Sequence, residues 1–391
     1  MVVISKRGEM ELNQKQVKDR KEMFSFFDSV LSNEQYLETD EEVGKKLYIK
    51  TQIIESNADL AMLNELKVDD YSFQLKPTDD KFLFNLIINS HRSTKPTIMY
   101  LDSIHKRYWK IYSLEKSIES AAFFKTLTRN SINLDSLWMP HQMLQEIGKK
   151  ENAISKGFSI KFSQRVALSD DEFSINDSDS KDFIHDFENF TIRLWTRKNK
   201  PSEKLMKLLE NENMPTTTTS TRLQIGSREN YVKDEIYYDG RFTIQKGNDF
   251  KEHNILVDDV IQNYQDKMEI IEAQRIQMEL KAEAFKMKGH PFELKFSNKI
   301  PIKKFVDKVF SSTNPFRVWG SEYDEQSDFL RIAAVDCHTG DMFNMDLMDK
   351  YARVYLRNKA CGNLIFRLYT NIQHYFDPKV TIRGENGQIF N

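Results

Sequence analysis

The chain has 391 residues, of which 39% are hydrophobic and 12% aromatic, with only 13 Gly and 9 Pro, so its composition excludes a largely disordered protein and favours two or three packed domains. Lys and Arg (57) nearly balance Asp and Glu (59), which excludes a global attraction to nucleic acid or acidic membranes and leaves only a local patch for such binding. The apolar stretches are far shorter than the roughly 20 residues that cross a bilayer, and the N-terminal residues lack the pattern of a secretory signal, so we expect a soluble, cytoplasmic protein.

The first 150 residues show alternating helix-like and strand-like patterns. Apolar residues at helical spacing between residues 11 and 31 predict an amphipathic helix that docks on the rest of the chain. Further on, the pattern predicts strands at 46–54, 97–101 and 108–114, followed by helices at 115–128 and 140–147. We therefore expect an α+β N-terminal domain over residues 1–150.

Residues 151–288 are predicted to form a central β-rich lobe. The acidic, Ser-rich segment 168–188 predicts a surface loop, and the Thr-rich segment 211–222 predicts either a linker or the start of an edge strand. Asp239-Gly240 between two strand-like arms predicts a hairpin. From His253 to Lys288 apolar residues recur every seven positions without Gly or Pro, which predicts one long helix that ends before Gly289.

Residues 289–391 are predicted to form a C-terminal α+β lobe. Their pattern indicates a strand, a helix at 302–310, three strands, and helices at 349–358 and 363–375. This element order resembles one half of the saddle fold of TATA-box-binding proteins over about a quarter of the chain, without a shared motif. GFSIKFSQRV (157–166) also resembles PFELKFSNKI (291–300), so the sequence suggests that the two β-rich lobes arose by duplication.

Several residues suggest enzyme chemistry, and each has a structural alternative that we favour. Cys361 precedes a predicted helix and could be a nucleophile with His338 or His374 as its base, but a buried thiol explains it as well. Glu293 and Lys295 form the Glu-x-Lys pattern of PD-(D/E)xK nucleases, which alternation along a strand also produces. The densest set of potential metal ligands also fits a turn between two strands, and consists of Asp336, Cys337, His338 and Asp341.

Other cofactor sites find little support in the sequence. The aspartates between residues 177 and 182 fail the EF-hand pattern because Lys181 occupies a ligand position, and no glycine-rich phosphate loop is present. We therefore expect no cofactor. A non-enzymatic role is favoured, and a metal-dependent nuclease or a cysteine hydrolase remains an alternative.

Three segments combine basic and aromatic residues, as nucleic-acid-binding surfaces do: 105–112, 193–200 and 351–359. The alternative is that the aromatic residues pack inward and the charges only solvate the surface. The residues predicted to contact phosphates are Arg193, Arg197, Lys198, Arg353 and Arg357. We expect a nucleic-acid-associated or complex-forming accessory protein with DNA or RNA as its partner, or else a protein-interaction module that acts through the long helix or self-associates.

Overall fold

The computed structural model describes residues 3–4, 10–11, 15–32, 48–68, 71–90, 96–115, 117–149, 153–163, 189–195, 216–281, 284–326 and 329–390. The predicted α+β class is confirmed, because helices accompany antiparallel strands in separate sheets. The chain groups into two compact units. Unit 1 contains residues 1–136, 226–234 and 240–255, and unit 2 contains residues 137–225, 235–239 and 256–391. No helix in the described ranges has the length and apolar character that crossing a bilayer requires.

Unit 1 is built on an antiparallel sheet with the strand order β14-β3-β8-β7-β6-β5-β4, and β9 also pairs with β3. Its strands are β3 (Lys50–Ser56), β4 (Lys67–Val68), β5 (Tyr71–Pro77), β6 (Leu83–Ser90), β7 (Thr97–Asp102), β8 (Tyr108–Ser113), β9 (Leu134–Ser136) and β14 (Arg241–Gly247). Its helices are α1 (Arg20–Ser32), α2 (Met62–Glu65) and α3 (Ser117–Asn130). A short pair, β1 (Val3–Ile4) and β2 (Met10–Glu11), precedes them.

The two faces of the unit 1 sheet are buried in different ways. One face is apolar, and Trp109 and Ile111 pack there with Phe123 of α3. On the other face Phe27 of α1 packs against Tyr112, with ring centroids 6.0 Å apart. Because both faces are covered, every residue of β3 is buried.

Polar residues on the second face form a buried hydrogen-bond network. His253 lies in the first turns of α8 (Phe250–Ala273). Its Nδ1 atom is 2.8 Å from Asp234 Oδ2, and its Nε2 atom is 2.7 Å from Thr51 Oγ1. This order of acid, base and hydroxyl matches that of a catalytic triad. All three residues have no exposed surface, however, so we assign the group a stabilising role.

Unit 2 contains a sheet with the strand order β18-β19-β20-β21-β17-β22-β23, and a separate group in which β10 pairs with β11 and β12. The strands are β10 (Ile154–Ser163), β11 (Asn189–Trp195), β12 (Thr216–Gly226), β17 (Phe292–Lys295), β18 (Val318–Gln326), β19 (Phe329–Asp336), β20 (Met342–Leu347), β21 (Tyr351–Leu356), β22 (Thr381–Gly384) and β23 (Gly387–Gln388). Its further helices are α4 (His141–Gly148), α9 (Ile302–Val309) and α10 (Asn363–Tyr375), and β13 (Tyr231–Tyr237) and α8 have residues in both units.

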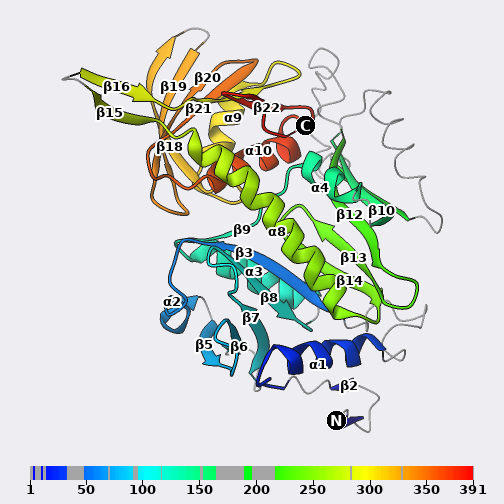
Figure 1. Ribbon diagram of the computed structural model, residues 1–391. Coiled ribbons are helices and arrows are strands. Elements are labelled where there is room, and N and C mark those ends of the chain that lie inside the picture. Colours follow the sequence, from blue (N-terminus) through cyan, green and yellow to red (C-terminus); the bar gives the residue numbers. More distant parts are fainter. Residues whose placement is uncertain are drawn as a thin grey trace, which may run out of the picture. The chain divides into compact units, whose positions relative to one another are not determined.

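One topology occurs twice in the chain (Figure 1). In unit 1, β3 and α2 are followed by the meander β5 to β8 and by α3, and β3 pairs with β8. In unit 2, β17 and α9 are followed by the meander β18 to β21 and by α10, and β17 pairs with β21. The duplication suggested from 157–166 and 291–300 does not match this repeat, because β10 pairs with β11 and β12 and so has a different place in its sheet.

Two predicted helices are wrong in part or entirely. The helix expected over His253–Lys288 ends at Ala273, and a hairpin of β15 (Gln277–Lys281) and β16 (Ala284–Lys288) follows. The helix expected at 349–358 is the strand β21. Apolar residues seven apart suggested a helix for 274–288, but Met278 and Leu280 also alternate with polar residues, and the strand uses that alternation.

Candidate nucleic-acid interface

The C-terminal sheet of unit 2 has one packed face and one solvent-facing side. Along β21, Ala352, Val354 and Leu356 are buried, whereas Tyr351 and Arg353 are only half-buried. The same alternation continues along β19 and β20. Helices α9 and α10 lie against the packed face (Figure 1). The other side, which we call the open face, is therefore accessible to a ligand.

The open face is rich in basic and aromatic side chains, as its strand register shows. Among the residues whose side chains are described, the basic ones are Lys295, Arg331, Arg353, Arg357 and Arg383, the aromatic ones are Trp319, Phe329, Tyr351 and Tyr355, and the acidic ones are Glu293 and Asp346. Two of the guanidinium groups lie over rings of their own strands: Arg353 is 5.3 Å from the centroid of Tyr351, and Arg331 is 5.0 Å from that of Phe329. Such pairs are common where a cation is held beside an aromatic platform.

A hollow of about 770 Å³ lies at one end of the open face. Its lining residues are Glu293, Lys295, Lys299, Ile302, Met348, Asp349, Lys350, Tyr351, Arg353 and Arg383. Five of them are cationic and two are anionic, so the hollow has a surplus of three positive charges. A cavity with this surplus attracts an anion.

The acidic residues of the hollow are each engaged by a cation. Asp349 lies 2.7 Å from Lys299 Nζ, and the hydrogen bond from Lys299 lowers the pKa of the Asp349 carboxyl below its usual value. Glu293 lies 3.4 Å from Arg353 Nη2. The ion pairs of the described residues do not involve Lys295, so its amine is available to a ligand phosphate.

The five residues predicted to contact phosphates are placed differently by the structure. Arg353 lies in β21 on the open face and lines the hollow, and the exposed Arg357 follows the same strand. They share a face as predicted, but on a strand rather than on a helix, because residues four apart are on the same side of both elements. Arg193 lies in β11, although its side chain is outside the described part, and Arg197 and Lys198 are outside the described residues.

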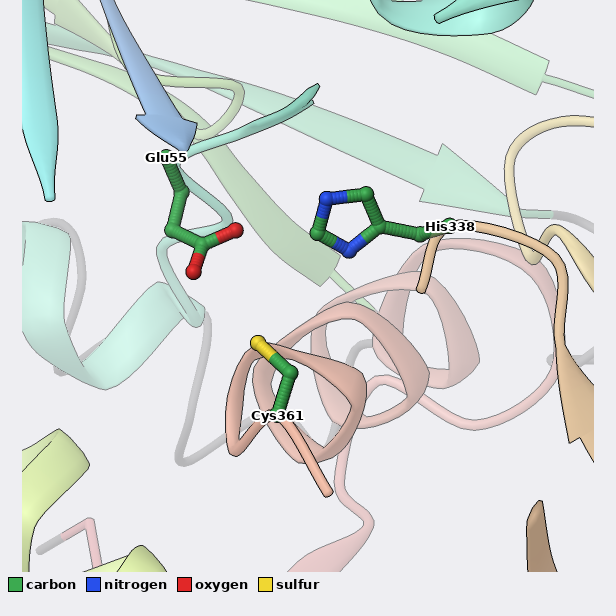
Figure 2. A group of neighbouring side chains, drawn as sticks. All are labelled: Glu55, His338 and Cys361. Carbon is green, nitrogen blue, oxygen red and sulfur yellow. The ribbon is translucent and has the colours of Figure 1, made fainter. Parts of the chain in front are cut away.

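The structure brings together two of the residues considered for catalysis. Figure 2 shows Cys361, just before α10, and His338, in the loop between β19 and β20. Both are buried, and an imidazole nitrogen of His338 lies within 4.8 Å of Cys361 Sγ. Glu55, also drawn there, belongs to unit 1. The thiol and the imidazole are neighbours, but their burial favours the structural interpretation of Cys361.

The residues predicted as metal ligands are used by the turn that contains them. Asp336 Oδ1 accepts hydrogen bonds from the backbone N–H of His338, at 2.9 Å, and from the buried guanidinium of Arg367. Asp341 Oδ2 accepts from Thr339 Oγ1 at 2.6 Å and from the backbone N–H of Cys361 at 3.1 Å. These contacts agree with turn chemistry between two strands. The acidic loop at 168–188, with Asp177, Asp179 and Asp182, lies outside the described residues.

His374, the other base considered for Cys361, is buried in a different setting. It stacks on Tyr238 with ring centroids 4.1 Å apart, and burial, followed by the charge of Lys161 and by His141, lowers the pKa of His374 to about 3. The ordinary pKa of a histidine is about 6.5. Because the folded-state pKa is lower, the stability that the neutral ring contributes is present above pH 6.5 and is lost as the pH falls toward 3.

A His374→Phe variant should therefore respond less to acid than the parent protein. We expect the parent to lose up to about 1.4 kcal/mol more per pH unit below pH 6.5. Urea unfolding of both proteins between pH 7.5 and 4.5 measures this difference. Parallel pH profiles would contradict the prediction.

The sequence can now be compared with known proteins. Residues 10–390 match a protein-family model described as MJECL33-like protein. The chain belongs to the MJECL33-like family. One relative, an uncharacterized protein of Methanocaldococcus jannaschii named MJECL33, is 30% identical in an alignment 366 positions long that covers 86% of each chain. The match covers both compact units and therefore includes the open face.

The sequence interpretation missed part of the open face of this MJECL33-like chain. Lys295 was considered only as half of a nuclease pattern, and Lys350, Arg383 and Trp319 were not considered. No local pattern marks these residues; the alternation of Tyr351, Arg353 and Tyr355 along β21 is compatible with one exposed side of a strand and indicates only the neighbouring part of the open face.

Proposed function

We propose that this protein is a non-enzymatic, nucleic-acid-binding accessory protein whose open face binds the ligand. The observation that carries this proposal is the hollow with its surplus of three positive charges, which lies beside Tyr351 on a sheet face that no helix of the described residues covers. Lysine and arginine bind phosphates, and the counterions released give such binding its salt dependence. The near-neutral net charge of −2 is compatible with this function because the cations are gathered locally.

The hollow also explains which residues should contact phosphates. Lys295 on β17 and Arg383 on β22 flank Glu293, which pairs with Arg353. When Glu293 is engaged by Arg353, Lys295 and Arg383 retain their charge for the ligand. Arg353 then has a double role, because it balances Glu293 and lies over the ring of Tyr351.

The proposal predicts steeply salt-dependent binding of nucleic acid. A Lys295→Gln, Arg383→Gln variant should bind more weakly and should lower the slope of log affinity against log salt by about two, one for each phosphate that the variant no longer neutralises. The slope is measured by fluorescence anisotropy with a labelled strand of about 20 nucleotides, at salt concentrations between about 50 and 300 mM.

The matched control removes two exposed positive charges from unit 1, as Arg228→Gln with Lys251→Gln. The control should retain the parent slope because neither residue lines the hollow. Absence of binding by the parent protein at low salt, or equal slopes in all three proteins, would refute the proposed site.

A second candidate, a complex-forming role, is favoured by the β15–β16 hairpin. Met278, Leu280 and Met287 are 71%, 66% and 70% exposed on it, whereas most apolar residues of α8 are buried and its two exposed isoleucines, Ile255 and Ile270, are 43% and 50% exposed. An isolated two-stranded hairpin is only marginally stable in water, and a partner would cover its apolar side. Under this candidate the hairpin, rather than the long helix, is the contact surface. Light scattering after size-exclusion chromatography tests self-association, which a Leu280→Lys variant should abolish.

A further inference from the structure

We infer that the ligand of the open face is single-stranded nucleic acid, held by stacking of its bases on Trp319 and Tyr351 while the hollow binds its phosphates. This inference rests on the proposed function and specifies its ligand class. Base stacking on aromatic side chains is available only where the bases are unpaired or splayed out.

The aromatic residues of the open face are accessible to a ligand. Trp319 is 54% exposed on β18, and Tyr351 is half-buried on β21. Apolar rings of this size usually lie in the core, so a set of them on one solvent-facing side of a sheet indicates a binding surface. The buried apolar residues of the same strands show that the unit does not lack a core of its own.

Two cations of the open face lie beside the ring of Tyr351. Arg353 lies over Tyr351, and Lys295 is directly opposite Tyr351 in the strand register. A base stacked on Tyr351 would thus have its phosphate close to two cations. Tyr355, four residues further along β21, is about 13 Å from Tyr351 at about 3.3 Å per residue, which extends the platform along one strand.

The phenol of Tyr355 is held by a neighbouring carboxylate. Its hydroxyl donates a hydrogen bond to Asp346 Oδ2 at 2.8 Å, and burial together with that carboxylate raises the pKa of Tyr355 above its usual value. The ring is therefore neutral and fixed in orientation at physiological pH. Rigid, pre-oriented rings lose little conformational entropy when a base stacks on them.

A duplex would use this surface poorly. Its paired bases are stacked on each other, so it could offer the hollow its phosphates but could not place a base face on Trp319 or Tyr351. The rings would then add little to the affinity. The preference between single and double strands is thus set by the aromatic residues, and the salt dependence is set by the cations.

The test compares three ligands of equal length: single-stranded dT20, an abasic strand with 20 phosphates, and a 20-base-pair duplex, with rU20 added to separate RNA from DNA. We expect dT20 or rU20 to bind at least about tenfold more tightly than the abasic strand. The Trp319→Ala, Tyr351→Ala variant should lose about tenfold per ring for dT20 and less than about threefold for the abasic strand.

Two controls make the result specific. The Trp319→Phe, Tyr351→Phe variant keeps a stacking face and should retain most of the affinity. Phe82→Ala removes a 37% exposed ring of unit 1 that also has a lysine, Lys81, 4.5 Å from its centroid, and should change nothing. Equal affinity for dT20 and the abasic strand, or for dT20 and the duplex, overturns the inference but leaves phosphate binding intact. Absence of binding to every ligand at low salt removes the proposed function itself.

Discussion

An Asp102→Asn variant is expected to lose about 3–5 kcal/mol of unfolding free energy, because it removes one member of a buried ion pair. Asp102 has no exposed surface, and its Oδ2 lies 3.0 Å from the Nζ of Lys110, which is equally buried. Arg20 also donates to this carboxylate but is about one quarter exposed and has Asp80 as a second partner. Arg20 can therefore adjust to the loss, whereas the buried Lys110 amine loses a charged partner and keeps the neutral Asn254 Oδ1 at 3.0 Å.

A compensating variant separates two effects on the free energy of unfolding, that of the isolated charge and that of the altered packing. Asp102→Asn combined with Lys110→Met should recover part of the loss, since the second change removes the charge that the first one isolates. Urea or guanidinium unfolding of the two single variants and the double variant gives the coupling energy. Additive effects of the two substitutions would show that the pair contributes nothing as a pair.

An Arg367→Met variant should be similarly destabilised, by about 3–5 kcal/mol. Arg367 is fully buried in α10, donates to the backbone oxygen of Phe316 at 2.7 Å, and binds the carboxylate of Asp336. Removal of the guanidinium leaves the Asp336 carboxylate in a site with 1% exposure. The free energy of unfolding from denaturant titration is the measurement.

The same experiment discriminates between a structural and a metal-binding Asp336. If Asp336 serves the ion pair, Asp336→Asn with Arg367→Met should be more stable than Arg367→Met alone, and a chelator should not change the melting temperature of the parent protein. A chelator-induced fall in the melting temperature would instead support a metal at this turn.

Local patterns predicted much of the fold. The helix expected at 363–375 is α10, and those expected at 302–310 and 140–147 are α9 and α4 within one residue at each end. The hairpin expected at Asp239-Gly240 is also present, with Gly240 at a φ of +77° between β13 and β14. In these segments the apolar period and the turn residues agree, so neighbouring residues suffice to define the element.

Other features depend on contacts between residues far apart in sequence and were not predictable. Residues 351–359 fit a helix and a strand equally well by spacing, and only their pairing with β17 and β20 makes them a strand. The hollow combines residues from β17, β21 and β22 and from the segments beside them, and no local pattern indicates that Lys295 and Arg383 meet there. Of the residues that line the hollow, the sequence therefore allowed only Arg353 to be predicted as a phosphate contact.

The pairing of β14 with β3 has a consequence for the synthesis of the protein. Arg241 pairs with Gln52, so the edge of β3 at Lys50, Thr51 and Gln52 stays uncovered while almost 190 further residues leave the ribosome, a delay of about 10 to 40 s at 5–20 residues per second. His253, which completes the buried network with Thr51, emerges later still. During that interval the nascent chain displays an unpaired strand edge that is prone to associate with other chains. Expression of this protein should accordingly depend on chaperones that shield β3 until the second half of the chain arrives.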